Sequence, residues 1–142
     1  MFNVDISLSL VKEMRFNPQD NCLFTFLGDR MITLLEFKEG QLNKKEVNRK
    51  VVANFSGLYT THAYFVDKNN ETKIFVCAST SEVLIFDKNC EFKSVVRIFF
   101  PEKYKHLEGL VVNKLFEYNK KLFAGCSNGT ILLVNSVQNK DY

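Results

Sequence analysis

The sequence contains no tryptophan, no Cys-x-x-Cys pair and no apolar run long enough to cross a membrane as a helix. Without such a cysteine pair, a structural zinc site has little support. The first ten residues lack the charged region and long apolar core of a secretory signal, so we expect a soluble, intracellular chain. No window of ten residues has a clean helical period, which argues against a helical fold.

The charge pattern also argues against nucleic-acid and membrane partners. The 19 Lys and Arg exceed the 16 Asp and Glu by only a formal charge of +3, and the basic residues are spread along the chain. The densest cluster, Lys44, Lys45, Arg49 and Lys50, has no interleaved aromatic residues of the kind that bind nucleic-acid bases. We therefore predict neither nucleic-acid nor membrane binding. A hydrophobic content of 46%, with 14 Phe, favours a packed core over disorder.

What the chain does contain is an internal repeat. Three stretches each place two apolar runs around a short polar turn: LFTFLGDRMITLLEF from Leu23, IFVCASTSEVLIFD from Ile74 and LFAGCSNGTILLVN from Leu122. Their starts, at positions 23, 74 and 122, are 51 and 48 residues apart. Two strand-like runs in a period of this size favour the blades of a β-propeller over a helical solenoid.

The pattern predicts an all-β fold of about three four-stranded antiparallel units, near residues 3–37, 46–87 and 94–135, which together form an incomplete propeller over residues 1–142. In each unit the first strand alternates polar and apolar residues, as an outer strand does, and the third is the most apolar, as an inner strand is expected to be. The predicted strands are 4–10, 11–16, 22–27, 31–37, 47–55, 59–66, 73–78, 82–87, 94–100, 110–116, 122–126 and 130–134.

Polar segments separate these runs. Asn128-Gly129 between two apolar runs predicts a two-residue hairpin loop, and residues 101–107 allow at most one turn of helix. The remaining predicted turns are Asn17–Asp20, Gly28-Asp29, Asp67–Thr72 and Ser79–Ser81. Four acidic residues that recur at matching positions are interpreted as turn residues: Asp29, Glu36, Glu82 and Asp87.

The core pattern of each unit resembles a WD repeat, and the best copy is Phe123–Asn135. The Trp-Asp dipeptide that ends such a repeat is replaced by Leu35-Glu36, Phe86-Asp87 and Val134-Asn135, which keep only its apolar-then-polar character. In WD-type propellers the outermost strand of each sequence repeat completes the preceding blade. The resemblance therefore implies an orphan outer strand at the start of the chain and a final blade that lacks one strand.

A closer resemblance links the chain to the axonemal WD-repeat proteins and covers about residues 11–134. The segments that carry it, in order, are FNPQDN (16–21), LLEFKEG (34–40), YTTHAY (59–64) and EVLIFD (82–87). Members of this family are much longer, with further blades and a coiled-coil region, and they tend to carry a glycine-containing turn where this chain has Ser79–Ser81.

The resemblance implies a non-catalytic scaffold of the ciliary or flagellar axoneme, a cytoskeletal component that docks or positions inner dynein arms. Its expected partners are other axonemal WD-repeat proteins and components of the inner dynein arms, with tubulin as a further candidate. The alternative is a WD-type protein-interaction scaffold of another intracellular assembly.

Candidate chemical motifs have simpler structural explanations. Residues 125–129 (GCSNG) match the nucleophile elbow G-x-S-x-G, but that motif requires a helix after the turn, and here a second β-run follows. His106 and Glu108 resemble the start of a deaminase zinc site, but no Pro-Cys-x-x-Cys follows. We interpret His62 as a hydrogen-bonded structural residue, and Cys77 and Cys126 as small core hydrophobes. No catalytic, cofactor-binding or metal-binding residue is predicted.

Overall fold

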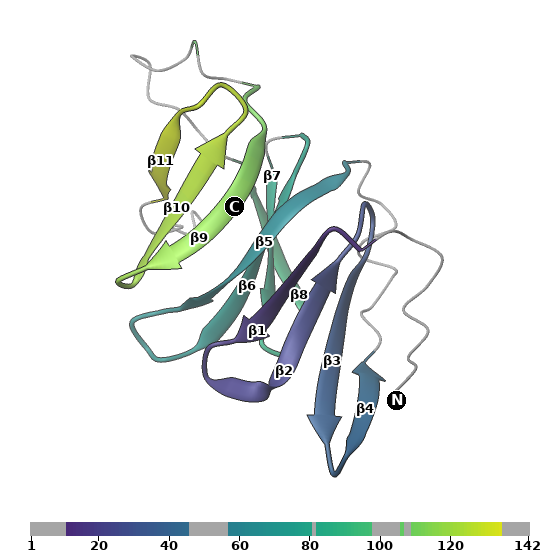
Figure 1. Ribbon diagram of the computed structural model, residues 1–142. Helices are drawn as coiled ribbons and strands as arrows, with labels where there is room; N and C mark the ends of the chain where they lie inside the picture. Colours follow the sequence, from purple (N-terminus) through teal and green to yellow (C-terminus); the bar gives the residue numbers. More distant parts are fainter. Residues whose placement is uncertain (1–10, 46–56, 81, 98–105, 107–108, 135–142) are drawn as a thin grey trace.

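The structure, a computed structural model, describes residues 11–45, 57–80, 82–97, 106 and 109–134. These residues form three antiparallel sheets whose strands follow one another in chain order, so the predicted all-β fold is confirmed (Figure 1). The first sheet contains β1 (Glu13–Asn17), β2 (Asp20–Leu27), β3 (Ile32–Lys38) and β4 (Gln41–Lys45). The second contains β5 (Tyr59–Val66), β6 (Thr72–Ala78), β7 (Glu82–Asp87) and β8 (Phe92–Arg97). The third contains β9 (Val112–Tyr118), β10 (Lys121–Cys126) and β11 (Ile131–Val134).

The three sheets lie side by side, with β5 between β1 and β9 (Figure 1). The strand β8, which the sequence pattern assigns to the third repeat, pairs with β7 and completes the second sheet. The third sheet has three strands within the described residues. Both observations agree with the displaced outer strand that the WD resemblance implies.

The most apolar strand of each unit is an inner strand, as predicted. These strands, β2, β6 and β10, are second in their sheets, so each has a hydrogen-bonded neighbour on both sides. The strands β1, β5 and β9 are innermost, where the sheets meet, and carry polar side chains that bond to one another (Figure 1).

Residues 22–27 are almost all apolar, which is typical of a strand buried on both faces, but β2 is not buried on both faces. Cys22 is exposed, and Phe24 and Phe26 are only partly buried, because one face of the first sheet has no further sheet against it within the described residues. The equivalent strand β6 lies between two sheets, and its residues 74–78 are all buried.

Several predicted elements fall partly or wholly outside the described residues: the strands 4–10 and 47–55, the end of the strand 94–100, and the segment 101–107 apart from His106. The fourth strand of the first sheet is β4, which the sequence pattern missed. Its sequence, QLNKK, is too polar to stand out, but it follows a tight turn at Glu39-Gly40, where both residues have positive φ (53° and 73°).

The β10–β11 connection is a three-residue loop rather than the predicted two-residue one. The Gly129 amide donates to the Cys126 carbonyl (3.0 Å), the Cys126 amide donates to the Thr130 carbonyl (2.8 Å), and only Gly129 has positive φ (84°). This is a turn followed by one left-handed residue. The same bonds recur in the second sheet at Asp67–Glu71 and at Asp87–Glu91.

All the tight turns that follow the first and third strands of a sheet lie at one end of the molecule. The strands alternate in direction, and contacts such as Glu13–His62 and Gln19–Asn70 show that β1 and β5 run in parallel. The loops at this end consist of Pro18-Gln19, Glu39-Gly40, residues 68–70, residues 88–90 and Asn119-Lys120. Of the acidic residues interpreted as turn residues, Asp29 and Asp87 lie at turns, whereas Glu36 lies within β3 and Glu82 begins β7.

Two apolar cores hold the sheets together. The first lies between the first and second sheets and contains Leu27, Leu34, Val76 and Phe86 among its buried residues. The second lies between the second and third sheets and is formed from the other face of the second sheet, including Phe75 and Ile85, together with β9 and β10. Neighbouring residues of β6 and β7 thus point into different cores, as the two-residue period of a strand requires.

We expect Gly129→Ala to lower the free energy of unfolding by about 1 kcal/mol, because its φ of 84° lies in the left-handed region that a Cβ disfavours. Urea denaturation of the two proteins measures the difference. Gly125→Ala is the matched control: its φ is ordinary and its added Cβ would meet only atoms of Lys114 at 3.8 and 3.9 Å. Equal losses in both variants would contradict the turn geometry.

Candidate functional site

The GCSNG motif does not form a nucleophile elbow. Ser127 is exposed in the loop between β10 and β11, so a strand follows it where the elbow requires a helix. The Ser127 amide donates to the Val111 carbonyl (2.9 Å), and the Asn128 side chain accepts from the Thr130 amide (3.0 Å). The motif is therefore explained by its hairpin.

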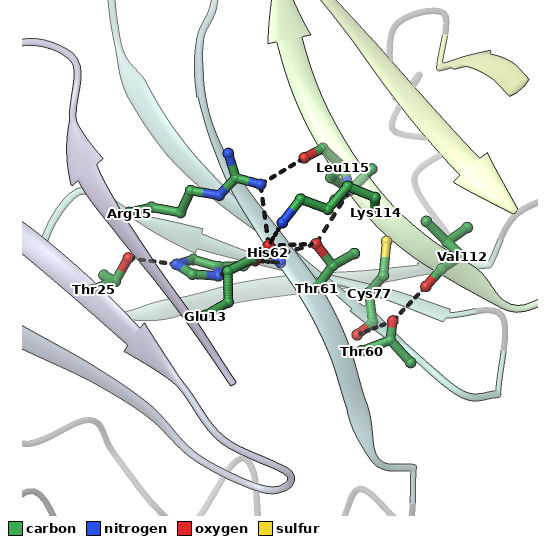
Figure 2. A network of polar contacts seen from close by, with 10 residues as sticks. All are labelled: Glu13, Arg15, Thr25, Thr60, Thr61, His62, Cys77, Val112, Lys114 and Leu115. Carbon is green, nitrogen blue, oxygen red and sulfur yellow. Dashed lines mark hydrogen bonds and ion pairs between the residues drawn. The ribbon is translucent and has the colours of Figure 1, made fainter. Parts of the chain in front are cut away.

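His62 is the centre of a buried polar network, which confirms its interpretation as a hydrogen-bonded structural residue (Figure 2). It lies on β5 and is completely buried. Its Nδ1 lies 2.8 Å from Oε2 of Glu13 on β1, and its Nε2 lies 2.7 Å from Oγ1 of Thr25 on β2. An ionised carboxylate can only accept, so Nδ1 carries the proton and Nε2 accepts from the Thr25 hydroxyl.

The Glu13 carboxylate is the acceptor that joins the three innermost strands. From β5 it accepts the amide of His62 (2.8 Å) and the hydroxyl of Thr61 (3.1 Å to Oε2), in addition to His62 Nδ1. From its own strand it accepts Arg15 Nη2 (3.1 Å), and from β9 it accepts the ammonium group of Lys114. Glu13 was not predicted from the sequence, where its signal is the alternation of Glu13 and Arg15 with Met14 and Phe16.

Further bonds extend the network to β9. The Thr61 hydroxyl accepts from the Leu115 amide (3.2 Å), and Arg15 Nη2 donates to the Leu115 carbonyl (3.0 Å). The Thr60 hydroxyl donates to the carbonyl of Val112 (2.6 Å) (Figure 2). The polar groups of the innermost strands are thus used to hold the sheets to one another.

The electrostatics keep Glu13 ionised and His62 neutral. Burial by itself raises the pKa of Glu13, but the hydrogen bonds from His62 and Lys114 outweigh it and hold the pKa well below its ordinary value of 4.5. Burial lowers the pKa of His62 from its ordinary value of 6.5; Glu13 opposes this shift, and the positive charges of Arg15 and Lys114 add to it. The single negative charge therefore faces two positive charges and a neutral imidazole.

The order Thr25, His62, Glu13 resembles the hydroxyl, imidazole and carboxylate of a hydrolytic triad. Both Thr25 and His62 are 0% exposed, however, so in this structure a substrate has no access to the Thr25 hydroxyl. These hydrogen bonds instead join β1 and β2 of the first sheet to β5 of the second.

The other candidate residues are not brought together. His106 is exposed, and Glu108 lies outside the described residues. Cys77 and Cys126 are buried in the second core, as predicted. Burial raises the pKa of the Cys77 thiol to about 12, and electrostatic repulsion from Cys126 and Glu13 adds to this shift. Within the described residues no cluster of three or more His, Cys, Asp or Glu could hold a metal ion. A helix able to span a membrane is not found in the described part of the chain.

Exposed apolar side chains lie on the two outer sheets of the described part of the chain. On the third sheet, Phe116, Tyr118, Ile131 and Leu133 are 40%, 70%, 67% and 42% exposed. On the first sheet, Met14 and Phe16 are 48% and 58% exposed. Such exposed apolar groups on neighbouring strands mark surfaces that contact other proteins.

Comparison with known proteins shows the fold. No protein-family model and no curated protein sequence matches the chain. A solved structure that does match is the β-propeller domain of Cps50 (Swd1) from Myceliophteria thermophila, with a TM-score of 0.61 and 11% sequence identity. The match covers 95% of this chain and 42% of that one, so the chain spans less than half the length of that propeller. The described sheets are therefore consecutive blades of a partial β-propeller.

We expect Glu13→Ala to lower the free energy of unfolding by about 3–5 kcal/mol, because it leaves the buried donors of Thr61 and His62 and two positive charges without their acceptor. Chemical denaturation measures this. The control is Glu36→Ala, whose only described ion pair is to Lys45 at 4.0 Å; this substitution should cost less than about 1 kcal/mol. Similar losses in both variants would mean that the network contributes little.

We also expect stability to fall as the pH drops from 6.5 towards 5. The pKa of His62 is lowered in the folded state, so below pH 6.5 the unfolded chain binds a proton that the folded chain does not. One proton limits the slope to about 1.4 kcal/mol per pH unit. Glu13, whose pKa is also lowered, adds a further loss below about pH 4.5. Thermal unfolding across this range tests it, and the exposed His106→Gln variant should keep the same dependence. A flat profile between pH 6.5 and 5 in the unsubstituted chain would exclude a buried neutral His62.

Proposed function

We propose that the chain is part of a WD-type β-propeller that acts as a non-catalytic protein-interaction scaffold. The observation that carries this proposal is the pair of exposed apolar faces on the first and third sheets. The polar side chains around Glu13 and His62 hydrogen-bond to one another and so join two blades. The Thr25 hydroxyl in this network is buried. Large exposed faces combined with an internal polar network favour assembly over catalysis.

We further propose that this scaffold belongs to the ciliary or flagellar axoneme, where it docks or positions inner dynein arms. The support is the ordered resemblance to the axonemal WD-repeat proteins, such as cilia- and flagella-associated protein fifty-seven. The segments occupy structurally specific places: FNPQDN forms the β1–β2 turn, LLEFKEG ends at the Glu39-Gly40 turn, and YTTHAY supplies Thr61 and His62. The partners proposed on this basis are other axonemal WD-repeat proteins, inner dynein arm components and tubulin.

The mechanism that fits a propeller is rigid positioning. A partner would make many modest contacts across blade surfaces, and a few buried aromatic anchors would supply most of the binding energy. Exposed aromatic residues at the outer sheets, such as Phe16, Phe116 and Tyr118, are the candidates for such anchors. The alternative remains a WD-type scaffold of another intracellular assembly, which the same fold and the same apolar faces support equally.

Tagging the native protein distinguishes the two assignments. An axonemal scaffold should give a signal along the cilium that persists after detergent removes the ciliary membrane, because its contacts are to the cytoskeleton. A tagged membrane protein of the same cilium serves as the extraction control. A signal confined to the cytosol or the nucleus would reject the axonemal role and leave the scaffold of another assembly.

A further inference from the structure

The imidazole of His62 has both of its nitrogens committed to the first sheet. The residue is completely buried on β5, in the second sheet. Its Nδ1 donates to Oε2 of Glu13 (2.8 Å), and its Nε2 accepts from Oγ1 of Thr25 (2.7 Å) (Figure 2). One nitrogen must therefore be a donor and the other an acceptor, which only the neutral ring provides. The junction between the first and second sheets is built around a neutral histidine.

A second proton on His62 would disturb this hydrogen bonding. A proton on Nε2 turns that acceptor into a donor aimed at the Thr25 hydroxyl, which must then direct its own hydrogen elsewhere. Thr25 is 0% exposed, and the group of the described chain that also senses its hydroxyl is Tyr64 on β5. The Tyr64 hydroxyl, whose pKa burial raises, is itself buried without a hydrogen-bond partner in that part of the chain. Passing the hydrogen to Tyr64 would thus move the unmet donor rather than satisfy it, which is costly.

The charges around His62 oppose a second proton as well. From β1, Glu13 faces it with a negative charge and Arg15 with a positive charge, and from β9 Lys114 adds a second positive charge. The side chain that β2 supplies is an uncharged threonine, and the residue opposite His62 on β6 is the apolar Val76. The described charges sum to +1 around a neutral ring and to +2 around a protonated one, at a site where His62 is shielded from water.

The junction between the second and third sheets is made without His62. Its core is apolar. The hydrogen bonds across it include the Thr60 hydroxyl to the Val112 carbonyl (2.6 Å) and the Leu115 amide to the Thr61 hydroxyl (3.2 Å). None of these groups gains or loses a proton between about pH 5 and pH 7. Mild acid therefore acts on one junction and spares the other.

We propose that His62 makes the junction between the first and second sheets pH-sensitive, so that in acid this junction opens while the junction between the second and third sheets stays closed. In the open form His62 reaches water and binds a proton at its ordinary pKa of about 6.5. Each pH unit below that value raises the open population by up to about tenfold. The protein would thus change shape in acid by a local opening rather than by global unfolding. The inference does not depend on the axonemal assignment.

The cysteines of the chain report on the two junctions separately. Cys90 is 1% exposed in the core between the first and second sheets, and Cys77 is 1% exposed in the core between the second and third. Cys22 is exposed. The reagent 4,4′-dithiodipyridine labels thiols in mild acid as well as at neutral pH, and mass spectrometry of the peptides assigns each label. The rate at Cys22 in the same molecule corrects for the change of intrinsic reactivity with pH.

Lowering the pH of the full chain from 6.5 to 5 should raise the labelling rate of Cys90 relative to Cys22. The expected rise is up to about tenfold per pH unit, because labelling follows the open population. The relative rate at Cys77 should rise much less, because its junction has no comparable titrating group.

The matched variants are His62→Gln and His106→Gln. A glutamine amide can donate to Glu13 and accept from Thr25 but takes up no proton in this range, so His62→Gln should abolish the rise at Cys90. His106 is exposed and is the other histidine of the chain, so its substitution should leave the rise unchanged. If His62→Gln does not fold, the unsubstituted chain still decides: protonation seen in the NMR ring signals of His62 should follow the same pH curve as labelling of Cys90.

Four results would overturn the proposal. An unchanged Cys90 rate between pH 6.5 and 5 would mean that the closed junction tolerates a protonated imidazole. Equal rises at Cys90 and Cys77 would mean that the chain unfolds as a whole. A rise that persists in His62→Gln, or ring signals that titrate apart from the labelling, would assign the opening to another group.

Discussion

The ionised carboxylate of Glu13, buried between three strands, is the interaction on which the arrangement of the sheets depends. Apolar cores hold the sheets together, but the hydrophobic effect has no direction and tolerates sliding. The donors of Thr61, His62 and Lys114 come from two neighbouring sheets and converge on one carboxylate, so they fix the position of each sheet relative to the others. A buried charge that is fully hydrogen-bonded in one arrangement is costly in every other arrangement, which selects a single packing of the three sheets.

The period of the sequence was sufficient to predict the fold, because strand formation is governed by local alternation and by turn residues. Its limits appear at particular residues. Apolar content correctly located β6 and β2 as inner strands, but it did not show that one face of β2 has no further sheet against it within the described residues, because the sequence shows how apolar a strand is and not what buries it. The polar strand β4 was missed because its place is set by the Glu39-Gly40 turn and by pairing with β3 rather than by its own pattern.

The polar network was less accessible to prediction than the fold. His62 could be recognised as structural from its place within a strand, but Glu13 is 49 positions away from it and Lys114 a further 52, so their meeting depends on how three sheets pack. The role of Thr25 was equally hidden, since a threonine within a strand is ordinary.

The tight turns at one end of the molecule restrict where residues can be inserted or deleted. Five loops of two or three residues, several with left-handed backbone, set the register of their strands, so an inserted residue there would shift whole strands. The strands that flank residues 46–58 and 98–111, which join one sheet to the next, end and begin at the opposite end. We therefore expect homologous sequences to differ in length mainly at the end where the sheets are joined, and new binding specificities to arise there. The loops at the end with the tight turns should keep their lengths.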